Sequence, residues 1–312
     1  MIRKSKVLVL LLLLSPVICL AADEFKSILF SKPQQVSSNV WSAIGATAPP
    51  RYENSGHNNN LSFIITGEGV VVVNAGDNYL LAKSLHEEIK SITDQPVKYV
   101  ILENGQGHAA LGSNYWQQQG VPVIAHIDTK RELEAHGYDI LDRMKKGRKE
   151  KANGTELSLP DETFEDEKII ELGDERIEVL HLGPTHSPGD VIVWLPKQKL
   201  VITGDMAFYN RMLPIMEHTD TAGWLETWEK FAALNAEIVI PGHGGPTNMQ
   251  EVTKHTKDYL VYMRAEVSKL LKEGASLHEA TKIDQSAYQN LDVFEELALR
   301  NASTLYRAME FE

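Results

Sequence analysis

Residues 181–196 read HLGPTHSPGDVIVWLP, a loop rich in Gly and Pro that runs directly into a strand-like run of apolar residues. The loop places His186 where the backbone can turn sharply and a side chain can face a cleft. Two later segments repeat this arrangement, with Asp205 in Thr-Gly-Asp and His243 in Pro-Gly-His-Gly-Gly-Pro. Singly, a loop histidine is most often structural, and an aspartate after Thr-Gly is most often a turn cap. The order and spacing of the three together indicate a metal or catalytic site.

Alternating strand and helix patterns surround these loops. In the second half the pattern predicts strands over 168–172, 176–182, 191–195, 200–203 and 238–240, and a helix over 222–234. In the first half it predicts strands over 61–66, 70–74, 97–102 and 121–125, helices over 79–93 and 129–146, and a short helical segment over 109–119. Two halves of this kind predict an α/β fold with two sheets and helices outside.

The rest of the chain lacks strand patterns. Residues 145–166 are dense in charge, Gly and Pro, which predicts an exposed connection rather than a domain boundary. From residue 249 onward the chain is predicted to be mostly helical, and its last helix, over 294–309, either packs across the outside or caps the site.

A fourth loop follows the predicted strand over 97–102 and reads Glu103-Asn104-Gly105-Gln106-Gly107-His108. It lies where a metal-binding loop would be expected, but it carries only one histidine. The function of the protein therefore depends on what this loop can still hold.

With these four loops the chain resembles the metallo-β-lactamase superfamily over roughly residues 55–250. The resemblance implies an αββα sandwich, with C-terminal helices and a metal site at one edge between the sheets. It predicts a metallo-β-lactamase-like domain over 22–250 and a helical extension over 251–312 packed on the same domain. The loops at 181–196, 203–205 and 241–246 are also similar, more weakly, to a secreted branch of zinc metallohydrolases associated with quinoprotein systems.

The family's metal ligands follow the order His-x-His-x-Asp-His, His, Asp, His. Four positions of this sequence match that order: His108, His186, Asp205 and His243. Three positions of the first motif depart from it: Glu103 stands for the first His, Gly105 for the second and Gly107 for the Asp. The resemblance thus implies a degenerate first motif.

One of the family's two metal positions keeps most of its ligands. Its set would be His108, Asp205 and His243, and two His with one carboxylate is a workable catalytic set for zinc or for non-haem iron. We therefore expect a hydrolase with one zinc ion rather than two, iron being an alternative, in which activated water attacks a lactam, lactone, ester or thioester. Asp205 and Glu103 would be the catalytic carboxylates, with Glu103 either the general base or an extra ligand.

Two other classes of function stay open. A metal-free or catalytically impaired member of the fold would bind a ligand without turnover, because three ligands are replaced. An iron-dependent redox member would hold iron and hydrolyse nothing.

Several side chains near these loops are candidates for supporting roles. His57 could supply a missing nitrogen or contact substrate, or lie on the surface; Arg211 could bind a substrate carboxylate or simply pack. Asp77 could orient a ligand or cap a turn. Gln106 could donate to an oxyanion or cap the following helix.

The N-terminal sequence predicts where the protein is located, and the net charge indicates which classes of partner it can bind. Residues 1–21 combine Arg3, Lys4 and Lys6 with an apolar run and small residues before a cleavage site, which predicts a signal peptide and a periplasmic or secreted protein. Cleavage removes the only cysteine, Cys19, and takes the formal net charge from −12 to −15 by loss of three cations. Such a charge disfavours nucleic acid. We expect a small-molecule substrate and no membrane contact after cleavage, and the oligomeric state is left open.

Overall fold

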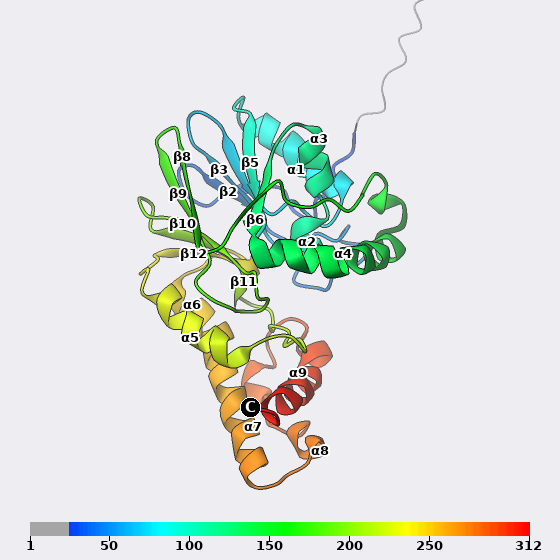
Figure 1. The fold of residues 1–312 in the computed structure, drawn as a ribbon, viewed down its shortest axis with the longest axis vertical. Helices are drawn as coiled ribbons and strands as arrows, with labels where there is room; N and C mark the ends of the chain where they lie inside the picture. Colours follow the sequence, from blue (N-terminus) through cyan, green and yellow to red (C-terminus); the bar gives the residue numbers. More distant parts are fainter. Residues whose placement is uncertain (1–24) are drawn as a thin grey trace, which may run out of the picture.

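The computed structural model describes residues 25–312 and contains two β-sheets packed face to face, with helices on both outer faces (Figure 1). This arrangement confirms the expected αββα sandwich with C-terminal helices. The predicted signal peptide over 1–21 lies outside the described residues.

The first sheet has seven strands, paired in chain order from β1 to β7. Pairing is antiparallel from β1 to β4 and parallel from β4 to β7. The strands are β1 (Gln34–Gln35), β2 (Val40–Ala43), β3 (Leu61–Ile65), β4 (Val70–Val73), β5 (Val97–Ile101), β6 (Val123–His126) and β7 (Glu162–Phe164).

The second sheet has five strands in the order β12-β11-β10-β9-β8. Only β11 and β12 pair in parallel. The strands are β8 (Glu167–Leu172), β9 (Glu175–Leu180), β10 (Ile192–Leu195), β11 (Leu200–Phe208) and β12 (Ile238–His243).

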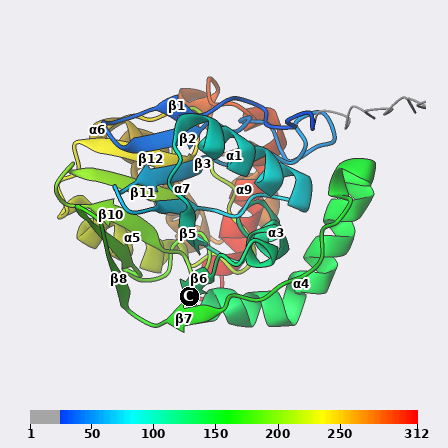
Figure 2. The ribbon, with the colours of Figure 1, turned by 90° about the horizontal axis from the view of Figure 1, so that it is seen from above.

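The helices fall into two groups, one for each sheet. On the first sheet are α1 (Tyr79–Ile92), α2 (Gly107–Ala110), α3 (Ser113–Gln118), α4 (Ile127–Arg148) and the 3₁₀ turn η1 (Lys149–Ala152). On the second are α5 (Thr221–Ala232), α6 (Met249–Val252), the π-helical turn η2 (Thr253–Lys257), α7 (Asp258–Lys272), α8 (Leu277–Ala280), the 3₁₀ turn η3 (Ser286–Tyr288) and α9 (Phe294–Met309). Figure 2 shows α4 running along the outside of the molecule.

Strand periodicity explains how the layers hold together. Along β4, Val70 and Val72 pack toward the helices of the first sheet, whereas Val71 and Val73 pack between the two sheets. Successive strand residues point to opposite faces, so a strand covered on both sides reads as a continuous apolar run. Helix α1 begins where the Asn78 side chain accepts the Leu81 N–H at 2.9 Å.

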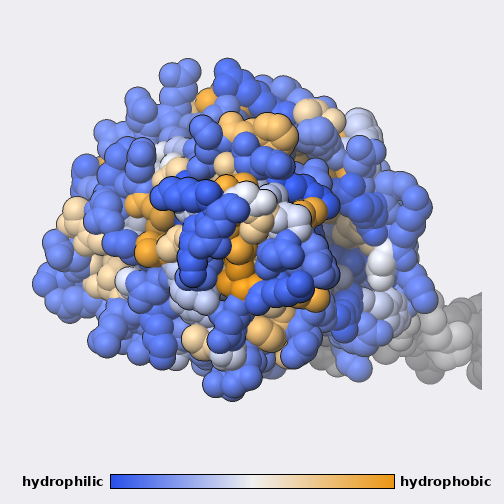
Figure 3. All heavy atoms as spheres, turned by 90° about the horizontal axis from the view of Figure 1, so that it is seen from below, coloured by the Kyte–Doolittle hydropathy of each residue, from blue (hydrophilic) through white to orange (hydrophobic). Residues whose placement is uncertain are grey.

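The C-terminal helices share one apolar cluster with the second sheet. Tyr259 of α7 and Leu305 of α9 belong to the same buried cluster as Phe208 of β11 and Trp224 of α5. Helix α9 packs across the outside of this layer, and the Asn301 amide bonds the backbone at Leu213. Figure 3 views the molecule from this end and shows apolar residues in small groups among hydrophilic ones.

Three sequence expectations need correction. The segment over 145–166 is not a simple exposed connection, because its first residues complete α4 and η1, and Arg148 is buried. Strands β1, β2 and β7 were not expected, since they are short. Asp205 lies inside the long strand β11 rather than on a loop after a strand.

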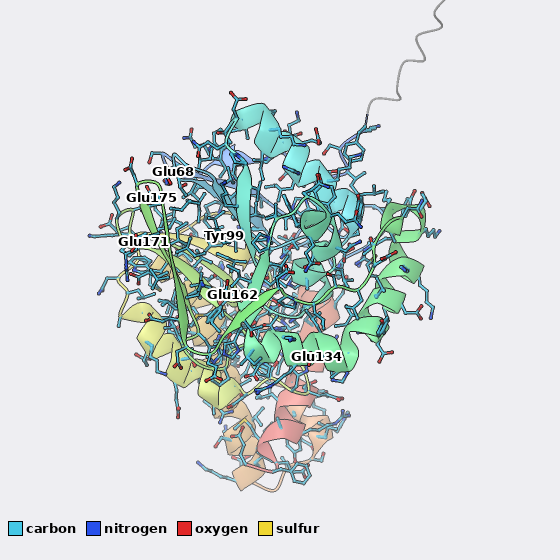
Figure 4. The ribbon with its side chains drawn as sticks, turned by 45° about the horizontal axis from the view of Figure 1, so that its top comes forward. Glu68, Tyr99, Glu134, Glu162, Glu171 and Glu175 are labelled. Carbon is cyan, nitrogen blue, oxygen red and sulfur yellow. The ribbon has the colours of Figure 1, made fainter. Side chains whose placement is uncertain are left out.

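The surface carries many acidic side chains, in keeping with the net negative charge of the sequence. Exposed glutamates lie on the β3–β4 turn, on α4, on β7 and on β8, and Figure 4 marks Glu68, Glu134, Glu162 and Glu171 among them. Among the helices in residues 25–312, none has the length and apolar character that crossing a membrane requires.

Candidate metal centre

Three backbone features bring the predicted ligands to one edge of the sandwich. His108 lies in the first turn of α2, just after β5, and His243 is the last residue of β12. The pairing of β11 with β12 shifts register around Gly204, which adopts φ +53°. Such irregularities re-aim the next side chain, and here that side chain is Asp205.

The side chains of His108, Asp205 and His243 form a buried group whose ligand atoms all lie within 4.8 Å of one another. His108 Nε2 is 3.4 Å from Asp205 Oδ2, and His243 Nε2 is 3.2 Å from Asp205 Oδ1. Ligands about 2.0–2.1 Å from a tetrahedral zinc ion are separated by about 3.3 Å. Asp205 Oδ1 also makes no hydrogen bond, although it is buried. The donor set and its spacing therefore fit one metal ion.

Two neighbours compete for Nδ1 of His243. It lies 2.6 Å from the Asn58 carbonyl oxygen, an acceptor, and 2.6 Å from Arg211 Nη1, a donor. With a proton on Nδ1, the carbonyl accepts its hydrogen bond and the Nε2 lone pair faces Asp205, which is the tautomer that binds a metal. Arg211 is 6% exposed and lies against the ring, so the structure gives it a place behind a ligand instead of the substrate contact considered above.

The charges of the group depend on one another. Burial disfavours a charge on His108, but the carboxylates of Asp205 and Glu103 outweigh it and raise the pKa of His108 to about 10. Burial also opposes the charge on Asp205, yet the neighbouring histidines hold its pKa well below the usual value. Burial lowers the pKa of His243 to about 3. A metal that binds here must displace the His108 proton, as metal binding to histidine generally requires.

Glu103 lies beside the three ligands. Its Oε1 is 3.2 Å from His108 Nε2, and its Oε2 is buried with no hydrogen-bond partner. Its backbone is fixed on both sides, because its N–H donates to Asn74 Oδ1 and its carbonyl accepts from Val191 N–H. Burial raises the pKa of Glu103. This carboxylate is held rigidly and retains an unused oxygen.

His186 also lies at the site but faces a different neighbour. Its Nδ1 is 3.6 Å from Asp205 Oδ2 and accepts a hydrogen bond of 2.7 Å from Gln106 Nε2. Burial lowers the pKa of His186 to about 4, so the ring is neutral near pH 7. Gln106 makes no side-chain cap bond to α2, and its amide is committed to His186, so neither role considered for it above is seen.

Helix α4 fills the space of the missing ligands. A Cβ atom on Gly105 would lie 2.7 Å from Glu132 Oε2, and one on Gly107 would lie 3.0 Å from Ile140 Cγ2. The two glycines therefore let α4 approach the loop closely, and its side chains occupy the places where the family's second His and Asp would project. Nothing in the sequence singled out Glu132, because it is one of many charges on a polar helix.

Asp190 organises the loop that carries His186. It is 4% exposed, accepts a 2.6 Å bond from Ser187 N–H and a 3.0 Å bond from Asn104 Nδ2, and thereby ties the loop to the one after β5. No role was predicted for Asp190, which lies in the loop within residues 181–196. The Ser-Pro-Gly-Asp spacing, typical of an aspartate that closes a turn, was the available signal.

His57 is fully buried. Its Nδ1 accepts from Phe30 N–H at 3.0 Å, and its Nε2 donates to the Ala43 carbonyl at 3.2 Å. Both ring nitrogens are therefore used by backbone. This placement excludes a surface position and gives His57 a structural position in place of the metal or substrate contact considered above.

The buried His57 predicts a pH dependence of stability. Burial lowers its pKa to about 4, below the value of about 6.5 expected when unfolded. Between these values the unfolded chain binds a proton that the folded chain does not, so stability falls as pH falls from 6.5 to 4, by about 2–3 kcal/mol at pH 4.5. Urea unfolding at pH 4.5 and 7.5 should show a smaller loss for His57→Asn than for the unchanged protein. Equal losses in the two proteins would contradict this role.

Asp77 forms a buried ion pair with Arg148. Its two carboxylate oxygens accept from Arg148 Nε at 2.9 Å and Nη2 at 2.8 Å, and the two side chains are 3% and 7% exposed. The turn-cap role falls to the next residue, Asn78, which caps α1. The pair ties the end of α4 to the loop after β4, beside the metal group.

A cavity of about 330 Å³ opens beside His108. Its lining includes Gln106 from the metal loop and Ile140, Arg143 and Met144 from α4. A second cavity of about 520 Å³ shares Ile140 and Arg143 with the first. Volumes of about 300–1,000 Å³ are typical of small-molecule sites, so the ligand group has room for a substrate next to it.

Comparisons with known proteins show which family the chain belongs to. The family described as the metallo-beta-lactamase superfamily matches residues 55–243. A linear primary-alkylsulfatase from Pseudomonas sp. (strain ATCC 19151) is 20% identical over 68% of this chain, which spans about half (47%) of that protein. A type 2 metallo-beta-lactamase from Bacteroides fragilis is 26% identical over 61% of this chain and 75% of its own length.

One solved structure shows that the fold of this chain is similar to that of a known protein. A metallo-beta-lactamase from Pontibacter korlensis superposes with a TM-score of 0.61 at 22% identity, covering 73% of this chain and 98% of that one. More than half of the chain lies in the family match, and the predicted ligand positions fall inside it. The chain belongs to the metallo-beta-lactamase superfamily.

Proposed function

We propose that this protein is a metal-dependent hydrolase that holds a single metal ion with His108, Asp205 and His243. The observation that carries the proposal is the buried grouping of these three donors at a spacing suited to one ion. The chain's membership of a superfamily of hydrolases supports the reaction class. The bond attacked would be that of a lactam, lactone, ester or thioester, and the relatives named above include both a lactamase and a sulfatase.

The residues around the donors have separable roles in this proposal. Zinc, or iron in its place, would supply Lewis-acid polarisation of the scissile carbonyl and would activate water near neutral pH. Asp205 and the two histidines hold the ion, with His243 in the tautomer whose Nδ1–H donates to the Asn58 carbonyl. Glu103 accepts the proton of the attacking water through its unpartnered Oε2. His186 accepts a hydrogen bond from Gln106 and lies 3.6 Å from Asp205 on the other side of the group.

The proposal extends to location. A signal peptide over 1–21 would place the mature enzyme in the periplasm or outside the cell, acting on a small molecule.

Metal content and one substitution test the proposal. The mature protein should contain about one zinc or iron per chain by elemental analysis and should turn over members of a lactam, lactone and ester panel. Glu103→Gln, which keeps the shape but cannot accept a proton, should lower kcat by about 10²–10⁴-fold while metal content is unchanged. Loss of metal in this variant would make Glu103 a ligand instead. Protein that takes up no metal from excess zinc would refute the hydrolase proposal.

A further inference from the structure

The cavity beside His108 has a charged wall that the proposed chemistry does not use. Helix α4 presents Glu132, Ile140 and Arg143 to the two cavities at the metal loop. Residues 132, 136, 140 and 143 are spaced three or four apart, and side chains at this spacing share one face of a helix. One face of α4 therefore forms a continuous wall along both cavities.

Most charges in the lining of the smaller cavity are already balanced. Arg148 is joined to Asp77 by two hydrogen bonds, and both side chains are buried. His108 faces the carboxylates of Glu103 and Asp205. Within residues 25–312, by contrast, no salt bridge or side-chain hydrogen bond involves the guanidinium of Arg143. Arg143 is exposed to solvent, and among the described residues it is the cation of this lining that has no ion-pair partner.

We propose that Arg143 binds a carboxylate of the substrate and thereby sets the enzyme's preference for anionic substrates. This inference rests on the hydrolase function proposed above. A guanidinium offers two parallel N–H donors that match a carboxylate, and such charge-assisted pairs are stronger than neutral hydrogen bonds. The protein carries a net charge of −12, but residues 143–151 hold six cations and one carboxylate, so Arg143 lies in a locally basic segment that attracts anions.

The rest of the lining fits a substrate with an apolar stem between its two polar ends. Ile140 and Met144 of α4 line the same cavity as Arg143, and His108 is the residue of the metal group that lines it. A substrate whose scissile group approaches His108 can then place aliphatic atoms against Ile140 and Met144 and a terminal carboxylate at Arg143. The preferred substrate class is an ester, thioester or lactam that carries a free carboxylate.

Two ester substrates, compared in Arg143→Gln and in a control variant that also loses one positive charge, test the inference. The p-nitrophenyl monoester of adipic acid keeps a free carboxylate, and its matched partner has a primary amide at that end. In Arg143→Gln the ratio of kcat/KM for the carboxylate ester to that for the amide ester should fall about tenfold to a hundredfold, through KM. Lys146→Gln removes one positive charge from the same helix, at an exposed side chain paired with Asp142, and should keep the original ratio. Equal ratios in Arg143→Gln and Lys146→Gln would overturn the inference.

Binding of adipate gives a result that does not depend on turnover. Calorimetry on the metal-bearing protein should show affinity for adipate weakened about tenfold or more in Arg143→Gln and unchanged in Lys146→Gln. If Arg143→Gln binds adipate as tightly as the unchanged protein, the inference fails even if the esters are hydrolysed. If adipate binding depends on Arg143 but no ester is turned over, the hydrolase proposal fails and the carboxylate site stands.

Discussion

Replacing His108 or His243 by alanine should empty the metal site and lower turnover by at least about a hundredfold. Each histidine supplies one of only three donors in the group, so two donors remain in either variant. Loss of a residue that merely orients a ligand typically costs about 10–100-fold in metal affinity or activity, and loss of a ligand should cost more. Elemental analysis of the purified variants, with activity on the ester panel, measures both effects.

The control for these variants removes a histidine elsewhere. His278→Ala changes α8, far along the chain in the C-terminal layer, and should keep metal and activity. Far-ultraviolet circular dichroism of each variant, compared with the unchanged protein, checks that the fold is kept, because both ligand rings are buried and His243 stacks on Phe208. Full metal content in both His108→Ala and His243→Ala would show that the ion, if any, binds elsewhere.

Asp77→Ala should lower the free energy of unfolding by about 3–5 kcal/mol. The substitution leaves the Arg148 guanidinium buried, 7% exposed, without its two-point partner. Removing one partner of a buried pair typically costs this amount, because the remaining charge is uncompensated. Urea denaturation followed by circular dichroism gives the value.

An exposed pair on the same helix is the matched control. Asp142 and Lys146 of α4 are 65% and 77% exposed, so Asp142→Ala should cost less than about 1 kcal/mol. The double variant Asp77→Leu, Arg148→Met removes both charges and should be more stable than Asp77→Ala alone. A similar small loss for Asp77→Ala and Asp142→Ala would mean that the buried pair does not anchor α4.

The elements that the sequence predicted well are those defined by local patterns. The buried run of β4, Val70–Val73, reads as a strand because both faces of the sheet are covered. Helix α1 shows apolar residues at helical spacing and ends before Pro96. The short strands β1 and β2 were missed, because two to four residues carry little periodicity and depend on pairing with β3.

The sequence predicted the strands and helices better than it predicted the roles of single residues near the site. The resemblance of the four loops to the family's motifs led to His108, Asp205 and His243, and the fold brings these three together. Arg211 lies against the ring of His243, but sequence proximity could not show that the polar atoms of Arg211 and His57 contact groups inside the protein.

By itself, the sequence determined the longer strands and helices, since these depend on residues that are neighbours along the chain, and its resemblance to the family determined the candidate ligands. Only the tertiary structure decided what stands where the first motif lacks its His and Asp. Helix α4 folds back over Gly105 and Gly107 and fills their space with Glu132 and Ile140, while Gln106 bonds His186. These contacts join residues far apart in the chain, so no local pattern specifies them. They arise because two glycines without side chains allow a helix to pack directly against the metal loop.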